Sequence, residues 1–304
     1  MSPPDPSSIA LTASLPSHET EPAPPSGGLV HWRRLQANKL ALASLVFIVF
    51  MLLVSLLAPW ISPYDPNAAA DPSLRLAPPG TPGHLLGLDG QGRDLLSRLI
   101  WGGRQSLLST IPPVAAAVLL SLALGLYAGY TRGRGSALVM RVIDILFAFP
   151  MVLLAIGLAT ALGPGLWTIG LTIVFSATPY LARVVYAGVR AERDKDYVEA
   201  ARALGASTRT VLFVEILPNV ATAAVVYGTT LVGSMIVFLA GLSFLGLGTQ
   251  PPTADWGRMV SEGAQVLVLD AAHVATVPAM TIVLVALAFN WLGNGLRDVL
   301  DPKN

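Results

Sequence analysis

Five stretches of this chain contain no charged residue, and each is long enough to cross a membrane. They lie between Lys39 and Asp65, Arg104 and Arg132, Asp144 and Arg183, Glu215 and Asp255, and Asp270 and Arg297. A spanning helix needs about 20 mainly apolar residues. Only 12% of the residues are charged, about half the share in soluble domains. The pattern therefore predicts an all-α integral membrane protein.

The two longest stretches determine how many helices we expect. The third can hold two spans, because Gly163-Pro164-Gly165 divides it with a turn signal. The fourth ends in residues 246–252, which are rich in Gly and Pro, and we interpret that end as an exit loop. We therefore expect six transmembrane helices, near residues 40–61, 106–130, 141–161, 166–188, 219–245 and 273–296.

Basic residues are distributed unequally between the two sides of these spans. Six spans place both termini on one side, and fourteen of the 19 Lys and Arg lie there. The other five are Arg75, Arg93, Arg98, Arg104 and Arg258. Because loops rich in Lys and Arg stay in the cytoplasm, we expect a multi-pass membrane protein with cytoplasmic termini.

The chain divides into three parts. Residues 1–30 are rich in Pro and Ser and lack the basic and apolar regions of a signal peptide, so we expect a disordered cytoplasmic tail. Residues 31–104 contain the first span and an extracytoplasmic loop. Residues 105–304 form a core of five spans, which includes a cytoplasmic loop over residues 190–218.

The loop over residues 190–218 contains the signals of two short helices. Residues 194–204 favour a helix, and Gly205 suits the left-handed conformation that ends one. Ser207 can cap the second helix, and Pro218 suits the first turn of the next span. We expect two helices that meet at a Gly hinge, the second facing the membrane domain with Val211, Leu212 and Phe213. The alternative is an amphipathic surface helix without a partner.

Polar side chains inside predicted spans are candidates for a functional role. Asp144 follows Arg141 by three residues, so the two can pair on one helix face, and the alternative is a role in a transport pathway. Arg183 can extend its guanidinium to the same interface. Asn290 lies deeper, where it either joins two helices by a hydrogen bond or contacts a substrate.

Residues 85–104 form a polar segment interrupted by glycines before the second span. Its charged side chains either pair with one another or contact an extracytoplasmic partner. They are Asp89, Arg93, Asp94, Arg98 and Arg104.

The sequence lacks the motifs of several kinds of chemistry. No lysine follows Gly, so the chain has no phosphate-binding Gly-Lys and we expect it not to bind ATP by that route. The chain has no cysteine, and His273 has no partner motif, so we expect no metal site. A net charge of +1 does not suggest nucleic acid. Gly241-Leu242-Ser243 resembles part of a rhomboid protease motif, but Phe244 stands where those enzymes have Gly, so we expect no catalytic residue.

Several separate segments resemble ABC importer permeases. Glu199-Ala200-Ala201, Gly205 and Leu217-Pro218 resemble the cytoplasmic signature loop of these proteins. Residues 32–39, 85–107, 241–259 and 286–302 resemble the second permease subunit of dipeptide, oligopeptide and nickel importers. The resemblance extends over residues 31–302.

This resemblance implies the type I ABC importer permease fold, a place in the inner membrane, and a subunit that forms half of a pathway for di- or oligopeptides. It implies a heterodimer with a related permease, two ATPases that hold ATP and Mg, an extracytoplasmic binding protein, and no cofactor on this chain. The residues that would couple to the ATPases are Glu199, Ala200, Ala201, Gly205, Leu217 and Pro218. Nickel and other small peptide-like solutes stay open as cargo, and an ATP-independent secondary carrier is an alternative of another class.

Overall fold

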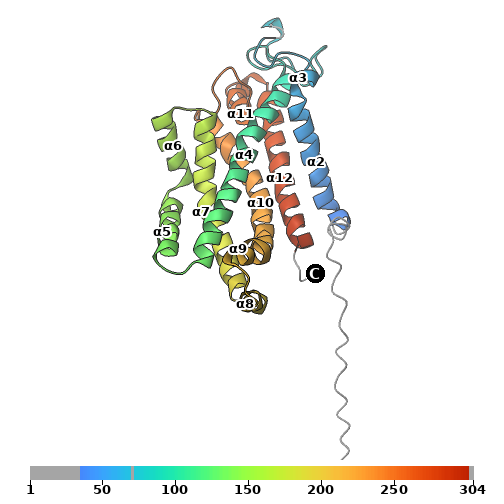
Figure 1. Cartoon of the computed structure of the whole chain (residues 1–304). Helices are drawn as coiled ribbons and strands as arrows, with labels where there is room; N and C mark the ends of the chain where they lie inside the picture. Colours follow the sequence, from blue (N-terminus) through green and yellow to red (C-terminus); the bar gives the residue numbers. More distant parts are fainter. Residues whose placement is uncertain (1–34, 70–71, 301–304) are drawn as a thin grey trace, which may run out of the picture.

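The computed structural model describes residues 35–69 and 72–300, and this part of the chain is helical (Figure 1). Two isolated β-bridges, Thr81–His84 and Leu88–Asp94, are its only extended pairings. The expected tail over residues 1–30 lies outside the described residues. The bundle has two ends. We call one the loop end, formed by α3 (Ala58–Ile61), the described residues of the loop over 62–94 (62–69 and 72–94) and α11 (Trp256–Ala264), and the other the α8 end, after α8 (Asp196–Ala203).

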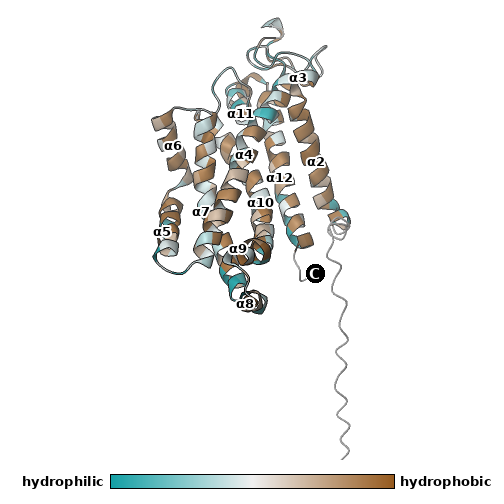
Figure 2. Cartoon of the chain, in the orientation of Figure 1, coloured by the Kyte–Doolittle hydropathy of each residue, from teal (hydrophilic) through white to brown (hydrophobic). Residues whose placement is uncertain are grey.

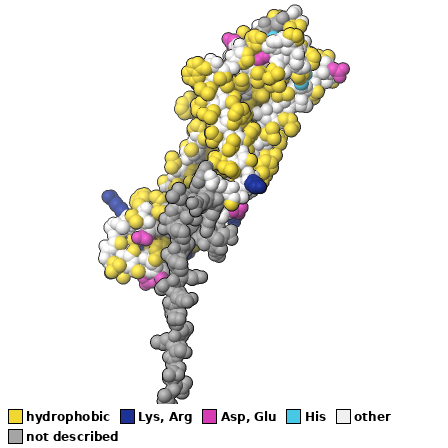
Figure 3. Space-filling model, turned by 90° about the vertical axis from the view of Figure 1, so that its right-hand side faces the viewer, with side chains coloured by type: hydrophobic (Ala, Val, Ile, Leu, Met, Phe, Trp, Pro, Cys, Tyr) yellow, Lys and Arg dark blue, Asp and Glu magenta, His cyan; other side chains and the backbone are white. Residues whose placement is uncertain are grey.

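Five helical segments within the described residues are long and apolar enough to cross a membrane. They are α2 (Lys39–Leu56), α4 (Leu95–Tyr130), α7 (Leu166–Arg193), the segment Thr208–Phe244 that contains α10 (Leu217–Phe244), and α12 (His273–Leu300). Their bodies are hydrophobic and their ends carry the hydrophilic residues (Figure 2). Hydrophobic side chains also cover most of the middle of the face shown in Figure 3. On α2, Val46 and Phe50 are exposed. Five of the six expected spans are thereby confirmed.

The expected span near residues 141–161 is interrupted at Pro150, a residue type that kinks or ends helices. The structure has α5 (Arg134–Ala148) and α6 (Met151–Leu162) there, bent by 90° at a short break. Pro150 has no N–H and disfavours a helical conformation in the residue before it. Phe149 is accordingly extended, with φ −80° and ψ 124°. Both helices pack on α7, and together they are long and apolar enough to form a broken span or a re-entrant loop.

The second span begins earlier than its hydropathy predicts. The Asp94 carboxylate accepts a hydrogen bond of 2.8 Å from the Ser97 N–H and so caps α4 at Leu95 instead of near residue 106. The first turns of α4 therefore stand within the polar loop end.

Small residues allow α4 and α7 to pack closely. A Cβ atom on Gly125 would lie 2.5 Å from Cγ1 of Val185, and one on Gly129 would lie 2.7 Å from Cβ of Val189. Both valines are completely buried. Glycine at such positions lets helix backbones approach in a membrane, where packing replaces the hydrophobic effect. Gly233 of α10 fits against Phe289 of α12 in the same way.

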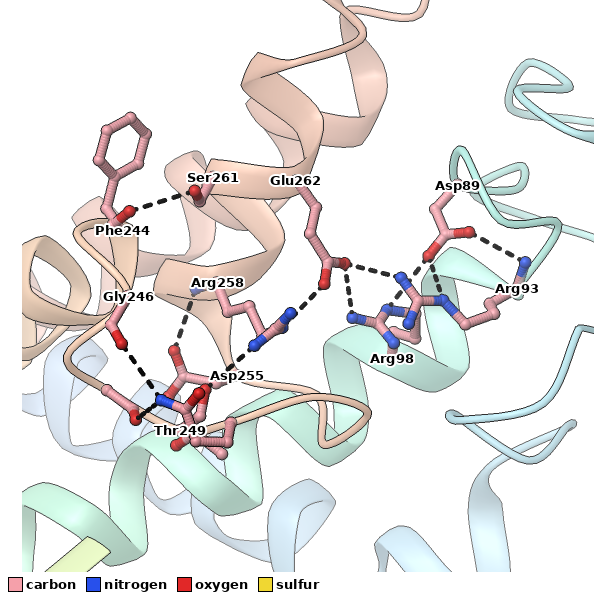
Figure 4. A network of polar contacts seen from close by, with 12 residues as sticks. Asp89, Arg93, Arg98, Phe244, Gly246, Thr249, Asp255, Arg258, Ser261 and Glu262 are labelled. Atoms are coloured by element: carbon pink, nitrogen blue, oxygen red, sulfur yellow. Dashed lines mark hydrogen bonds and ion pairs between the residues drawn. The ribbon is translucent and has the colours of Figure 1, made fainter. Parts of the chain in front are cut away.

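A network of charged side chains fastens the loop end (Figure 4). The Asp89 carboxylate binds Nε of Arg93 at 2.7 Å and Nε of Arg98 at 3.3 Å. Glu262 of α11 binds the same two arginines at 2.7 and 2.9 Å. Its other oxygen accepts a hydrogen bond of 2.8 Å from Arg258. The network therefore joins the loop over residues 62–94, α4 and α11 into one unit.

Replacing Glu262 by Gln tests whether the network holds the loop end together. Arg93 and Arg98 are at most 4% exposed, and the change leaves them with Asp89 as their only carboxylate partner. We expect a loss of about 3 kcal/mol in stability, the lower end for breaking a buried ion pair, because Glu262 itself is one-fifth exposed. The measurement is the melting temperature of the purified protein in detergent.

The control is Glu199→Gln, which makes the same chemical change on an exposed side chain of α8. Equal melting temperatures for the two variants would show that the network does not hold the loop end together.

Candidate functional site

The α8 end contains the residues that the sequence assigned to coupling, and it is built on the last turn of α7. Arg193 is buried, and its Nη1 donates to the Gly129 carbonyl at 2.9 Å and to the Tyr130 carbonyl at 3.3 Å. The end of α7 is thereby held against the end of α4. The hydrogen bond from Arg193 also lowers the pKa of Asp194, where the chain leaves α7. From this point α8 projects beyond the bundle (Figure 1).

The turn after α8 has the expected conformation. Gly205 has φ +84°, in the left-handed region, and its N–H donates to the Arg202 carbonyl at 3.0 Å. Ser207 then accepts a hydrogen bond of 3.2 Å from the Thr210 N–H and caps the next helix. The predictions for Gly205 and Ser207 are confirmed.

The expectation of a separate second short helix needs correction. The turn α9 (Thr208–Thr210), the π-helical turn η3 (Val211–Ile216) and α10 follow one another without a gap. Leu217 donates its N–H to the carbonyl of Leu212, five residues earlier. Because a proline ring inside a helix clashes with the carbonyl four residues back, this wider turn makes room for Pro218. Pro218 lies in the first turn of α10, as expected, although α10 continues the π-helical turn without a gap.

Apolar side chains fix α8 to the bundle. Val198 is completely buried in a cluster with Val189 of α7, Val211, and Val220 of α10. Val211 faces the bundle as expected, and Leu212 is partly buried beside it. Phe213 was expected to face the same way but is 60% exposed. Two residues along a helix rotate the side chain by about 200°, so Phe213 points away from Val211.

A tyrosine that the sequence analysis missed adds polar contacts to this apolar anchor. The Tyr197 hydroxyl donates to Glu192 of α7 at 2.6 Å and accepts a hydrogen bond of 3.2 Å from Asn219 of α10. Partial burial and the Glu192 carboxylate raise the pKa of Tyr197 to about 12, so the hydroxyl keeps its proton at neutral pH. Lys195 binds the second oxygen of Glu192 at 2.6 Å. These bonds tie α8 to two long helices at once.

The outer surface of α8 is left open. Glu199 and Ala200 are exposed, and Leu204 is 89% exposed at the end of the helix. Ala201 and Leu217 are partly buried, and Pro218 is exposed. The six residues assigned to coupling therefore lie along one loop, but only some of them are at its surface.

The charged residues of the loop end are turned inward. Asp89, Arg93, Asp94 and Arg98 are at most 4% exposed. This burial favours contacts within the chain, and contact with an extracytoplasmic partner stays a prediction. The alternative of an ion-pair set describes Asp89, Arg93 and Arg98, whereas Asp94 caps α4 and binds Nδ1 of His84 at 2.9 Å.

Both polar groups predicted inside spans have partners other than those expected. Asp144 binds Nη2 of Arg183 on α7 at 2.7 Å, instead of Arg141 on its own helix, because α5 lies against α7. Asn290 donates to the Ala286 carbonyl of its own helix at 2.9 Å, so the expected bond between helices is replaced by packing against Gly233. No group of three or more metal-ligating side chains occurs in residues 35–69 and 72–300.

Comparisons with known proteins agree with this architecture. The family model described as "Binding-protein-dependent transport system inner membrane component" matches residues 121–304. A second model, for the N-terminal TM domain of oligopeptide transport permease C, matches residues 29–79.

Curated relatives match along almost their whole length. The di/tripeptide transport system permease protein DppC of Pseudomonas aeruginosa (strain UCBPP-PA14) is 42% identical over 277 residues, 90% of this chain and 91% of the relative. The glutathione transport system permease protein GsiD of Pectobacterium atrosepticum is 39% identical over 272 residues, 90% of each chain.

A solved structure shares the fold. The MetNI methionine ABC transporter in an inward-facing conformation matches with a TM-score of 0.55 at 19% identity, over 67% of this chain and 97% of that chain. The chain therefore belongs to the binding-protein-dependent transport system inner membrane components, as a multi-pass membrane permease with the type I ABC importer fold.

Proposed function

We propose that this permease imports di- or oligopeptides and that its α8 end couples transport to ATP hydrolysis on partner subunits. The relatives support the cargo class, because one is named for di- and tripeptides and another for glutathione, itself a tripeptide. Nickel remains the alternative cargo within the family.

The coupling role is supported mainly by the shape of α8. This helix projects from the bundle with Glu199, Ala200 and Leu204 at its surface. Its inner side is fixed by Val198 and Tyr197 to α7 and α10. A force on the outer surface therefore reaches two long helices. The proposed coupling loop spans residues 190–218 and uses Glu199, Ala200, Ala201, Gly205, Leu217 and Pro218.

The proposed partners rest on the family to which the chain belongs. Lys39, Lys195 and Lys303 are its only lysines and none follows Gly, so it has no phosphate-binding Gly-Lys motif. Two ATPases supply ATP and Mg at the α8 end, a related permease completes the pathway, and a binding protein delivers peptide at the loop end. In the proposed division of the chain, residues 1–30 are a cytoplasmic tail, residues 31–104 the first span and its loop, and residues 105–304 the core.

In the proposed cycle, ATP-driven closure of the two ATPases pushes α8 and opens the pathway to the loop end, and hydrolysis resets it. The energy enters as a difference in ATP affinity between two conformations.

We expect the α8 end to be cytoplasmic, because fourteen of the 19 basic residues lie on the side of that end in a six-span topology. A reporter that is active only in the cytoplasm, fused after Asn304, should be active. Activity of a periplasmic reporter at the same position would reverse the orientation.

Replacing Gly205 by Val should uncouple the complex. A side chain at positive φ costs about 1–2 kcal/mol, which shifts the population of the turn about tenfold. We expect peptide uptake to fall about tenfold while ATP hydrolysis continues, both measured on the purified complex in liposomes.

The matched control is Gly163→Val. Gly163 has φ +83° and, like Gly205, no atom within 4 Å of an added Cβ, but it lies in the turn between α6 and α7. If the two variants transport equally well, strain at Gly205 has no special effect on coupling.

The isolated chain should neither hydrolyse ATP nor move peptide. Reconstituted alone in liposomes, it should accumulate no labelled tripeptide with or without ATP. Adding the related permease, the ATPases and the binding protein should start ATP-driven uptake. Accumulation by this subunit alone would favour the ATP-independent carrier.

A further inference from the structure

A groove at the loop end lies between α4 and α7. Its apolar part is a cavity of about 510 Å³ lined by Leu108, Pro112, Pro113, Trp167 and Leu171, among other residues. Gly170 also lines it and has no side chain to fill it. Leu108 is 53% and Trp167 87% exposed, so large apolar surfaces face the opening.

The groove continues into a more polar hollow of about 340 Å³. Gln105 and Leu108 line both parts, so the two are joined. The polar part is lined also by Asn67, Trp101, Arg104 and Thr253. Both volumes lie in the range of about 300–1,000 Å³ that is typical of small-molecule sites.

Arg104 differs from the other arginines at this end. Arg93, Arg98 and Arg258 bind carboxylates, and Arg75 donates to the Gly90 carbonyl at 2.8 Å. Among the described residues, Arg104 has neither an ion pair nor a hydrogen bond. Its guanidinium carbon lies 5.4 Å from the centre of the Trp101 ring. The expectation that Arg104 joins the ion-pair set of the loop end is therefore corrected.

The position of Arg104 makes this lack of a partner informative. It is half-buried and is the last charged residue before the charge-free part of α4. A partly buried charge is disfavoured unless it is paired. A guanidinium presents two parallel N–H donors that match a carboxylate. The mouth of the groove is thus complementary to an anion, and its inner part to an apolar group.

We propose that this groove binds the transported peptide, with Arg104 holding the C-terminal carboxylate and the cavity beside Pro112 and Trp167 holding an apolar side chain. The inference rests on the proposed function and extends it to the residue that recognises the cargo. Every peptide with a free C-terminus has the carboxylate, and the cavity is apolar without being specific for one shape. Such a site distinguishes peptides from other solutes and still accepts many sequences.

The test compares Arg104→Gln with the wild-type complex in liposomes. We expect the KM for a tripeptide with a free C-terminus to rise at least about tenfold, the size of a lost charge-assisted hydrogen-bond pair. Arg104→Lys keeps the charge but lacks the two parallel N–H donors of the guanidinium. Its KM should therefore lie between those of the wild type and Arg104→Gln. Arg75→Gln removes the same charge from an exposed site at the same end and should leave the KM unchanged.

A second measurement reports occupancy directly. The chain has no cysteine, so Leu108→Cys places the subunit's one thiol in the groove. The free-acid tripeptide should slow its reaction with a water-soluble maleimide, and the C-terminally amidated tripeptide should not. Combining Leu108→Cys with Arg104→Gln should abolish the protection. Gln105→Cys replaces Leu108→Cys if that variant does not assemble.

The outcomes distinguish a failure of this proposal from a failure of the proposed function on which it rests. If the wild-type complex takes up no peptide, the proposed function fails. If it takes up peptide, but Arg104→Gln leaves both the KM and the protection unchanged, the groove is not the peptide site. A thiol that does not react in the assembled complex would show that another subunit covers the groove, which also overturns the proposal.

Discussion

The close packing of α7 on α4 is the interaction on which the other features depend. Gly125 and Gly129 leave no room for a side chain against Val185 and Val189. The same two valines belong to the apolar cluster that holds Val198 of α8. Because packed interiors resist deformation, α8 cannot shift far without displacing α7 and, with it, α4.

Both helices extend from that cluster to the groove at the loop end. Leu108 and Pro112 of α4 and Trp167 of α7 line the groove, while Glu262 fastens the first turns of α4 to α11. Under the proposed function, a push on α8 therefore changes the relation between two helices that are packed together at the α8 end, of which α4 is also held at the loop end. Packed interfaces of this kind shift between discrete arrangements, as alternating access requires.

Sequence reasoning succeeded where the signal is local. Charge-free stretches predicted five continuous spans, and Gly205 and Ser207 were assigned from the residue types that turns and caps require. It failed where partners are distant in the chain. Asp144 pairs with Arg183 instead of Arg141, and Glu262 reaches Arg93 across 169 residues. Pro150 was expected to kink or end a helix, and the helix breaks there between α5 and α6.

Under the proposed function, an ATPase binds the outer surface of α8. Since the chain has no cysteine, Ala200→Cys places a single thiol on that exposed surface, and Leu85→Cys places one on the loop end, where Leu85 is 68% exposed. Crosslinking of the assembled complex with a short bifunctional reagent measures which thiol lies next to the ATPase. An ATPase bound to α8 should give an adduct with Ala200→Cys and none with Leu85→Cys. The reverse pattern, or no adduct at Ala200 in a complex that transports, would contradict this placement of the ATPase.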